Sequence, residues 1–372
     1  MRPPCIILHS LHGHYLREFE PLITRLGVVG CGYGAQVLVP AFRADPRTQV
    51  VAIASRQLAR AQAAAQALGI PRFVDDWRVL LDPNHLDALA IAAPPDAQAE
   101  IARAALECGL HVFAEKPLAL TLDSARSLAG AAARSGRAHA IDFNFREIAA
   151  LRKAHEIIES QALGPLRHVA VTWQVESFAN QARIESWKTD QRAGGGALSN
   201  FVSHSLDYLE WLAGPINGLS ARLAGMPGDS RRNDTFVAMN FQFASSAAGS
   251  LVMSAAAYRG SGHRIEFYGD EGSLVMENRG LDHMRGFELR LALRPHDFTS
   301  VPIGLQDQDV WEDGRVLPSS RIIRRFLDWI HEGRPADPNF TAGLRVQCLL
   351  DDARRSHETG RWVEVGAQEA RI

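Results

Sequence analysis

The chain contains few cysteines and no long apolar run. Its 372 residues include 4 cysteines, which lie far apart and form no C-x-x-C pair: Cys5, Cys31, Cys108 and Cys348. This spacing disfavours both a disulfide framework and a cysteine zinc site, and it fits a reducing compartment, so we expect a cytoplasmic protein. No apolar segment approaches the roughly 18 residues of a membrane-spanning helix, so we expect no membrane partner.

An excess of positive charge is also absent. The chain has 40 Lys and Arg residues against 42 Asp and Glu residues, and its formal net charge is −2. These numbers indicate no strongly basic surface, so we do not expect a nucleic-acid partner. A hydrophobic content of 46% and a charged content of 22% are typical of a globular protein. At about 100 to 200 residues per domain, the length predicts two domains.

The first 24 residues lack the pattern of a nucleotide-binding strand. His9, His12 and His14 interrupt the apolar stretch at residues 5–8 before it reaches the roughly 7 to 15 residues of a signal-peptide core. We therefore interpret residues 1–24 as an N-terminal extension that could be disordered. We do not interpret its histidines as metal ligands.

A glycine-rich turn follows a short apolar strand in the segment RLGVVGCGYGAQ, residues 25–36. Gly30, Gly32 and Ala35 match G-x-G-x-x-G/A, which allows a tight turn, close approach of a pyrophosphate, and packing of helix on strand. The N–H groups at the start of the next helix would also bind phosphate. An ordinary strand-to-helix turn is the alternative for the glycines alone. The residues expected to touch a dinucleotide here are Gly30, Gly32, Tyr33, Gly34 and Ala35.

Two different patterns divide the rest of the chain. Strand and helix patterns alternate over residues 25–145, which predicts a parallel sheet with crossover helices, a Rossmann-type domain. Strand-like runs between residues 219 and 277 are instead separated by turns, which predicts an antiparallel sheet in a second, α+β domain over residues 146–372. We expect a loop over residues 294–318 and helices over residues 320–331 and 342–359.

The segment Glu115-Lys116-Pro117 follows the fifth predicted strand. The carboxyl ends of strands in an open α/β sheet are where ligands bind, and the glycine turn lies at the same edge. Pro117 would fix the loop, so Lys116 is well placed for chemistry. A surface lysine after a strand is the alternative interpretation.

Four motifs in this order resemble the Gfo/Idh/MocA oxidoreductases, which include glucose-fructose oxidoreductase and inositol dehydrogenase. They are the glycine turn, IAAPPDAQAE at residues 91–100, AEKPLALTLDSA at residues 114–125 and GGGALSNFVSHSLDYLEWL at residues 194–212. The resemblance implies an α/β fold with an N-terminal Rossmann parallel sheet and a C-terminal α+β domain that has a large open, mainly antiparallel sheet. It also implies a nicotinamide cofactor, a sugar-like substrate bound between the domains, and a homodimer or homotetramer formed through the open sheet.

The resemblance also implies catalytic roles. Lys116 would contact substrate and stabilise charge on the reacting oxygen, and His204, expected to titrate near neutrality, would exchange the hydroxyl proton. Asn200 stands where the family has an acidic residue; an amide can orient substrate but supplies no negative charge. Some relatives that act on nucleotide sugars resemble this chain in having Asn there, so a nucleotide-linked or uronic sugar is among the expected substrates.

Further substrate and cofactor contacts are expected on both sides of the site. Arg146 and Trp187 are expected to bind substrate, although a tryptophan is as often part of a core. Ser55, Arg56 and Arg60 offer a hydroxyl and cations at the end of the second strand, where NAD-dependent dehydrogenases have Asp or Glu. We therefore favour NADP, with NAD as the alternative. The remaining expected cofactor contacts are Ala93, Pro94, Pro95, Glu115, Lys116 and Asn144.

The sequence thus predicts an NAD(P)-dependent sugar dehydrogenase or reductase that acts on a CH–OH group. Two alternatives stay open. One is an NAD-dependent glycosidase-type reaction on the same fold, and the other is a dinucleotide-binding protein without catalysis.

Overall fold

The computed structural model describes residues 23–303 and 310–366. Residues 1–22 of the predicted extension lie outside the described residues. Thr24, the last residue that we assigned to the extension, begins strand β1, and its N–H donates to the carbonyl of Arg47 at 2.8 Å.

The first sheet has six parallel strands in the order β3-β2-β1-β4-β5-β6. This order is that of a Rossmann domain, so the predicted parallel sheet is confirmed. The strands are β1 (Thr24–Val29), β2 (Thr48–Ala54), β3 (Arg72–Val74), β4 (Ala88–Ile91), β5 (His111–Ala114) and β6 (His139–Ile141). The helices between them are α1 (Val39–Arg43), α2 (Leu58–Leu68), α3 (Pro95–Glu107) and α4 (Leu122–Ser135).

The second sheet has nine strands in the order β14-β13-β12-β11-β7-β10-β9-β8-β15. Only β7 and β10 run parallel, so the mainly antiparallel prediction is confirmed. The strands are β7 (Leu166–Gln174), β8 (Ile216–Ala224), β9 (Phe236–Phe243), β10 (Ala248–Ser254), β11 (Gly262–Gly269), β12 (Gly272–Asn278), β13 (Glu288–Leu293), β14 (Thr299–Ser300) and β15 (Val363–Glu364). The loop predicted over residues 294–318 was partly wrong, because β14 pairs at the edge of the sheet and a helix begins at Val316.

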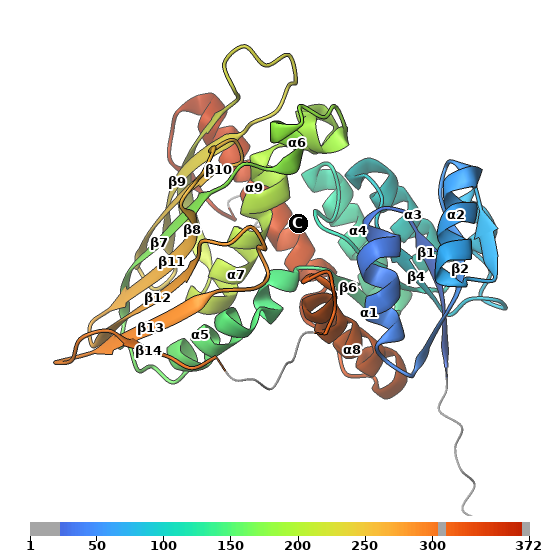
Figure 1. Cartoon of the computed structure of the whole chain (residues 1–372), viewed down its shortest axis with the longest axis horizontal. Helices are drawn as coiled ribbons and strands as arrows, with labels where there is room; N and C mark the ends of the chain where they lie inside the picture. The colour runs from blue at the N-terminus through green and yellow to red at the C-terminus, as the bar shows by residue number, and fades with distance from the viewer. Residues whose placement is uncertain (1–22, 304–309, 367–372) are drawn as a thin grey trace, which may run out of the picture.

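Helices cover one face of the second sheet. In Figure 1, α5 (Ala149–Glu159), α7 (Ser203–Ala213) and α9 (Phe340–Thr359) lie between this sheet and the Rossmann domain. Within the described chain, no helix covers the opposite face, where the side chains are mainly small or polar, as at Ala170, Thr172 and Ser250.

Helix α8 (Val316–Glu332) lies far along the chain but packs on the Rossmann sheet. Its apolar face includes Ile322 and Phe326, which are fully buried. The Phe326 ring meets Phe42 and Phe113 edge to face, at 6.4 and 5.8 Å between ring centres. The packing of this helix therefore crosses the domain boundary that we expected at residue 146. No helix of the described residues is long and apolar enough to span a bilayer.

Candidate active site

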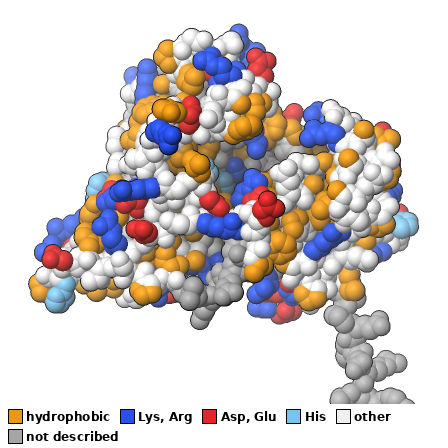
Figure 2. Space-filling model, in the orientation of Figure 1, with side chains coloured by type: hydrophobic (Ala, Val, Ile, Leu, Met, Phe, Trp, Pro, Cys, Tyr) orange, Lys and Arg blue, Asp and Glu red, His pale blue; other side chains and the backbone are white. Residues whose placement is uncertain are grey.

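A cavity of about 1070 Å³ lies between the Rossmann strands and the helices of the second sheet. Figure 2 shows that basic and acidic side chains gather on the face where the two halves of the molecule meet. Of the predicted site residues, the following line the cavity: Gly30, Gly32, Tyr33, Ser55, Arg60, Ala93, Glu115, Lys116, Asn144, Trp187, Asn200 and His204. The following do not line it: Gly34, Ala35, Arg56, Pro94, Pro95 and Arg146.

The glycine turn is shaped by contacts on one side and open space on the other. Gly30 has φ +114°, and a Cβ there would lie 2.3 Å from the carbonyl oxygen of Ala92. A Cβ on Gly32 would meet no atom within 4 Å, so this backbone is open to the cavity. Gly34 acts in packing instead, since its Cβ would lie 3.1 Å from Val28. An open backbone at the second glycine is what approach of a pyrophosphate requires.

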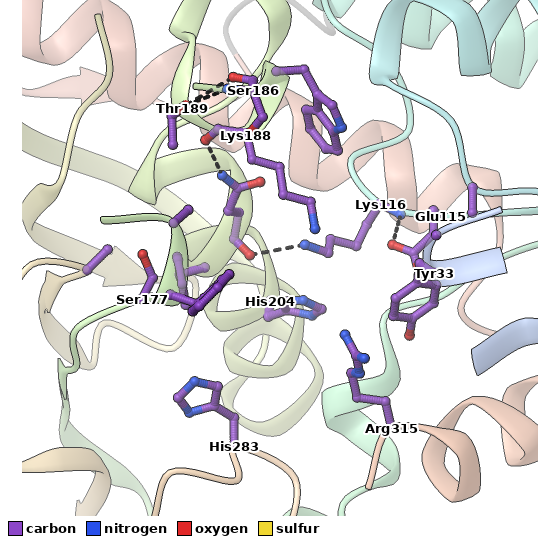
Figure 3. Close-up of a pocket in the computed structure, with 18 of the residues that line it drawn as sticks. Tyr33, Glu115, Lys116, Ser177, Ser186, Lys188, Thr189, His204, His283 and Arg315 are labelled. Carbon is purple, nitrogen blue, oxygen red and sulfur yellow. Dashed lines mark hydrogen bonds between the residues drawn. The ribbon is translucent and has the colours of Figure 1, made fainter. Parts of the chain in front are cut away.

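Lys116 projects from the end of β5 into the cavity (Figure 3). Its Nζ donates to the backbone carbonyl of Asn200 at 3.0 Å. Burial lowers the pKa of Lys116 to about 8, and the nearby charge of Lys188 adds to this effect while Glu115 opposes it. An ammonium with a lowered pKa can donate a hydrogen bond at neutral pH and lose its proton in mild base.

His204 lies in the first turn of α7, against an aromatic wall. The residue is 7% exposed, and its ring lies 4.5 Å from the ring of Phe145, centre to centre. Burial, together with the positive charge of Lys116, lowers the pKa of His204 well below its ordinary value. The expectation that His204 titrates near neutrality was therefore wrong: the imidazole is neutral. Nδ1 is enclosed without a hydrogen-bond partner in the described structure, which leaves Nε2 for a ligand.

Asn200 reaches the site through its backbone as well as its side chain. It lies in a π-helical turn, η6 (Leu198–Val202), just before α7. Its carbonyl accepts from Lys116, and its side-chain Nδ2 donates to the carbonyl of Lys188 at 2.9 Å. Asn200 thus joins the segment that carries Lys116 to the segment that carries Lys188. Helix periodicity alone did not predict this arrangement.

The glycine run before η6 packs directly on the backbone of Trp187 and Lys188. A Cβ on Gly195 would lie 2.3 Å from the Trp187 carbonyl oxygen, and a Cβ on Gly196 would lie 2.2 Å from Oδ1 of Asp234. Only glycine fits these positions without moving the backbone. The run therefore brings Trp187 and Lys188 to the cavity wall, and Lys188 faces Lys116 across it (Figure 3).

A buried polar network behind Lys116 was missed by the sequence analysis. The Tyr33 hydroxyl donates to Oδ2 of Asp142 at 2.9 Å, and the Ser319 hydroxyl donates to the same oxygen at 2.8 Å. Asn144 Nδ2 donates to both hydroxyls, at 3.0 and 3.2 Å. Burial and the neighbouring Glu115 raise the pKa of Asp142 well above its usual range. The other Asp142 oxygen, Oδ1, is buried without a hydrogen-bond partner among the described residues.

Two further cavity residues, Arg315 and His283, also come from segments far along the chain. Arg315 lies over the Tyr33 ring, 5.1 Å from its centre, and pairs with Asp313 at 2.6 Å. The sequence placed Arg315 in a loop and held no signal that would bring it to the glycine turn. Burial lowers the pKa of His283, which therefore adds no charge.

Arg146 has a different place from the one predicted. Its guanidinium forms ion pairs with Asp207 at 2.5 Å and with Asp337 at 2.8 Å, and it lies outside the cavity. Both Asp207 oxygens are engaged, so the expected role of Arg146 in substrate binding has no support in this geometry.

Comparisons with known proteins agree with this architecture. Residues 24–143 match the family described as "Oxidoreductase family, NAD-binding Rossmann fold", and residues 151–275 match the GFO/IDH/MocA C-terminal domain. An uncharacterized oxidoreductase of Synechocystis sp. is 32% identical over 355 residues, which cover 91% of this chain and 95% of that protein. Levoglucosan dehydrogenase of Pseudarthrobacter phenanthrenivorans is 27% identical over 384 residues, covering 91% and 97%.

Solved structures resemble the chain over nearly its whole length. A levoglucosan dehydrogenase in complex with NADH superposes with a TM-score of 0.83 at 26% identity, covering 92% of this chain and 99% of that one. The same enzyme with NADH and levoglucosan also gives 0.83, at 25% identity over the same shares. The chain therefore belongs to the Gfo/Idh/MocA family of oxidoreductases.

Proposed function

We propose that the protein interconverts a secondary alcohol and a ketone, or an aldehyde equivalent, on a sugar, polyol or sugar derivative, with NAD(P) as the redox partner. The observation that carries this proposal is the pairing of Lys116 with the neutral, buried His204 beside the open glycine turn, in one cavity. Relatives whose names specify sugar substrates support the same chemistry, including the levoglucosan dehydrogenase that binds NADH and levoglucosan.

The cavity fits a nicotinamide dinucleotide. The open backbone at Gly32 suits a pyrophosphate, and Ser55 and Arg60 line the cavity near the end of β2. Asn144 lines the cavity beside Tyr33, to whose hydroxyl its Nδ2 donates, and its Oδ1 has no hydrogen-bond partner among the described residues. The bound nicotinamide would supply the carbon that exchanges hydride with the substrate.

The residues of the chain would manage the proton and the charge. The Lys116 ammonium would donate to the reacting oxygen and stabilise negative charge that develops there. Neutral His204 would accept the hydroxyl proton at Nε2 during oxidation and return it during reduction. Asn200 would hold Lys116 in place through its carbonyl, and the tilted contact of the His204 ring with Phe145 would fix the angle of the imidazole.

The choice between cofactors rests on the end of β2. The two residues directly after Ala54 are Ser55 and Arg56, and neither is acidic. Arg60 lines the cavity beside Ser55, whereas Arg56 does not line it. We infer that NADP is preferred, with Arg60 and Ser55 holding the 2′-phosphate. A relative from Haloferax volcanii is named as an NADP-dependent xylose dehydrogenase, and it is 35% identical over 46% of this chain.

The open sheet face supports a homo-oligomer. A broad sheet with one uncovered face of small and polar residues suits isologous packing against a second copy, and we propose a dimer or tetramer built this way.

The free thiols of Cys31 and Cys108 suit the reducing cytoplasm that we propose as the compartment of the protein.

A panel of sugars, polyols and nucleotide sugars, followed by nicotinamide absorbance, tests the proposed reaction. The expected result is hydride transfer to or from at least one member, lost in His204→Ala. Glycoside cleavage with retained cofactor and no net change in absorbance would favour the glycosidase-type reaction. Tight dinucleotide binding with neither reaction would favour a binding protein.

A further inference from the structure

Two lysine side chains approach each other across the substrate half of the cavity. In Figure 3, Lys188 extends from the upper wall toward Lys116, with His204 beneath them. The Nζ of Lys188 has no hydrogen bond or ion pair in the described parts of the chain, and it lies 5.7 Å from the centre of the Trp187 ring. Lys116 donates only to a backbone carbonyl. Neither ammonium therefore has a carboxylate in direct contact.

The Lys188 backbone is held by hydrogen bonds, which fix the point from which its side chain enters the cavity. Its carbonyl accepts from Asn200 Nδ2 at 2.9 Å and from the N–H of Gly196 at 3.0 Å. The turn that carries it is closed by a bond from the Ser186 N–H to the Thr189 hydroxyl at 3.0 Å, and the Thr189 hydroxyl also donates to the Ile184 carbonyl at 2.9 Å. These bonds fix where the lysine begins, while its side chain stays exposed to the cavity.

None of the acidic residues that line the cavity forms an ion pair with Lys116 or Lys188 in the described chain; these residues are Glu115, Asp234, Asp282, Glu312 and Asp313. Asp313 forms an ion pair with Arg315 at 2.6 Å, and Asp234 accepts from the N–H of Leu198 at 2.7 Å. Glu115 offsets part of the Lys116 charge, and its Oε2 accepts from the backbone N–H of Lys116 at 3.1 Å. Two ammonium groups that face each other repel unless an anion lies between them. Asn200, the residue between the two segments, supplies no charge.

We propose that the anion comes from the substrate: the site takes a sugar derivative that bears a carboxylate, held between Lys188 and Lys116. This inference rests on the proposed function and narrows its substrate class. A carboxylate would accept charge-assisted hydrogen bonds from both ammonium groups. It would also supply the negative charge that the neutral side chain of Asn200 does not provide. The aromatic ring of Trp187 next to Lys188 would pack on an apolar face of the sugar ring.

Matched substrates test the proposal directly. Glucuronate is compared with glucose, and galacturonate with galactose, because each pair differs only in the carboxylate. Glucose 6-phosphate is a third comparison, in which the anion is a phosphate. We expect the wild-type protein to favour the uronates in kcat/KM by about tenfold or more, and we expect Lys188→Gln to lower that ratio about tenfold. Lys188→Arg keeps the charge and should keep the ratio. Arg192→Gln removes a cation that is exposed on the same loop but outside the cavity, and it should leave all rates unchanged.

The possible results separate the two proposals. Neutral sugars turned over as well as uronates, or a uronate preference that persists in Lys188→Gln, would overturn the carboxylate assignment and leave the oxidoreductase proposal intact. A preference for glucose 6-phosphate over the uronates would also overturn it, in favour of a phosphate. Calorimetry of glucuronate binding to the protein with NADPH, which cannot accept a hydride, provides a second readout, in which Lys188→Gln should weaken binding about tenfold. Uronate binding without turnover would instead count against the proposed reaction.

Discussion

Arg146 holds Asp207 through two parallel hydrogen bonds, from Nε to Oδ2 at 2.7 Å and from Nη2 to Oδ1 at 2.5 Å. The Asp207 side chain is fully buried, and the Arg146 side chain is 10% exposed. Asp207 lies on α7 less than one turn after His204, while Arg146 follows β6 of the Rossmann sheet. The pair therefore fixes the helix that carries His204 to the cofactor half of the molecule.

Removing one partner of this pair should destabilise the protein. We expect Arg146→Met to lower the free energy of unfolding by about 3 to 5 kcal/mol, because it leaves Asp207 buried without a counter-charge. Denaturant unfolding measures the change. The double variant Arg146→Met/Asp207→Leu should recover much of the loss, since it removes both charges. Wild-type stability in Arg146→Met, together with a raised KM, would instead restore a role for Arg146 in substrate binding.

The activity should depend on the protonation of Lys116. Because burial and Lys188 lower the pKa of this lysine to about 8, its charge is present below that pH and is lost above it. We expect kcat/KM to be level from pH 6.5 to about 8 and to fall about tenfold per pH unit above. Lys116→Arg, which stays charged, should lose this fall even if its rate is lower. A rate that rises through pH 8 would show that neutral Lys116 acts as the base.

His204 should be required for proton transfer and dispensable for cofactor binding. We expect His204→Gln to lower kcat by about 10²- to 10⁴-fold, the usual contribution of a positioned acid or base. The dissociation constant for the dinucleotide, measured by fluorescence, should stay unchanged, since the glycine turn is not altered. Because the imidazole is neutral in the fold, the wild-type rate should show no inflection near the ordinary histidine pKa of 6.5. An inflection at that pH that disappears in His204→Gln would contradict the neutral assignment.

The cofactor preference should follow Arg60 rather than Arg56. Arg60 lines the cavity and Arg56 does not, although both lie just beyond β2. We expect Arg60→Ala to weaken NADP binding about tenfold or more with little effect on NAD, because it removes a contact to the 2′-phosphate. Arg56→Ala is the matched control and should change neither affinity. Equal affinities for NAD and NADP in the wild-type protein would contradict the proposed preference for NADP.

Much of the fold could be predicted because its signals are local. The glycine turn, the predicted helix at residues 58–68 with Gly69 behind it, and the strand at residues 111–114 all depend on short sequence patterns, and the structure has each of them. The edge strand β14 could not be predicted, since its two residues are held by pairing with β13 rather than by their own pattern.

The site was less predictable, because it depends on contacts between distant segments. Lys116 and His204 lie in recognisable motifs and both reach the cavity. Asp142, Ser319 and Arg315 were missed, since their roles exist only once α8 has packed beside β6 and the glycine turn. The lowered pKa of His204 was also missed, because burial is a property of the folded chain.

The packing of α8 makes the Rossmann unit discontinuous in sequence. A fragment that ends near residue 145 would leave Phe42 and Phe113 without the aromatic partner that Phe326 provides, and would leave Asp142 without Ser319. A chimera in which only the N-terminal segment is exchanged between relatives, to change the cofactor specificity, would therefore lose the matched contacts between this segment and α8. A chimera that preserves these contacts must take its cofactor half from both ends of the gene.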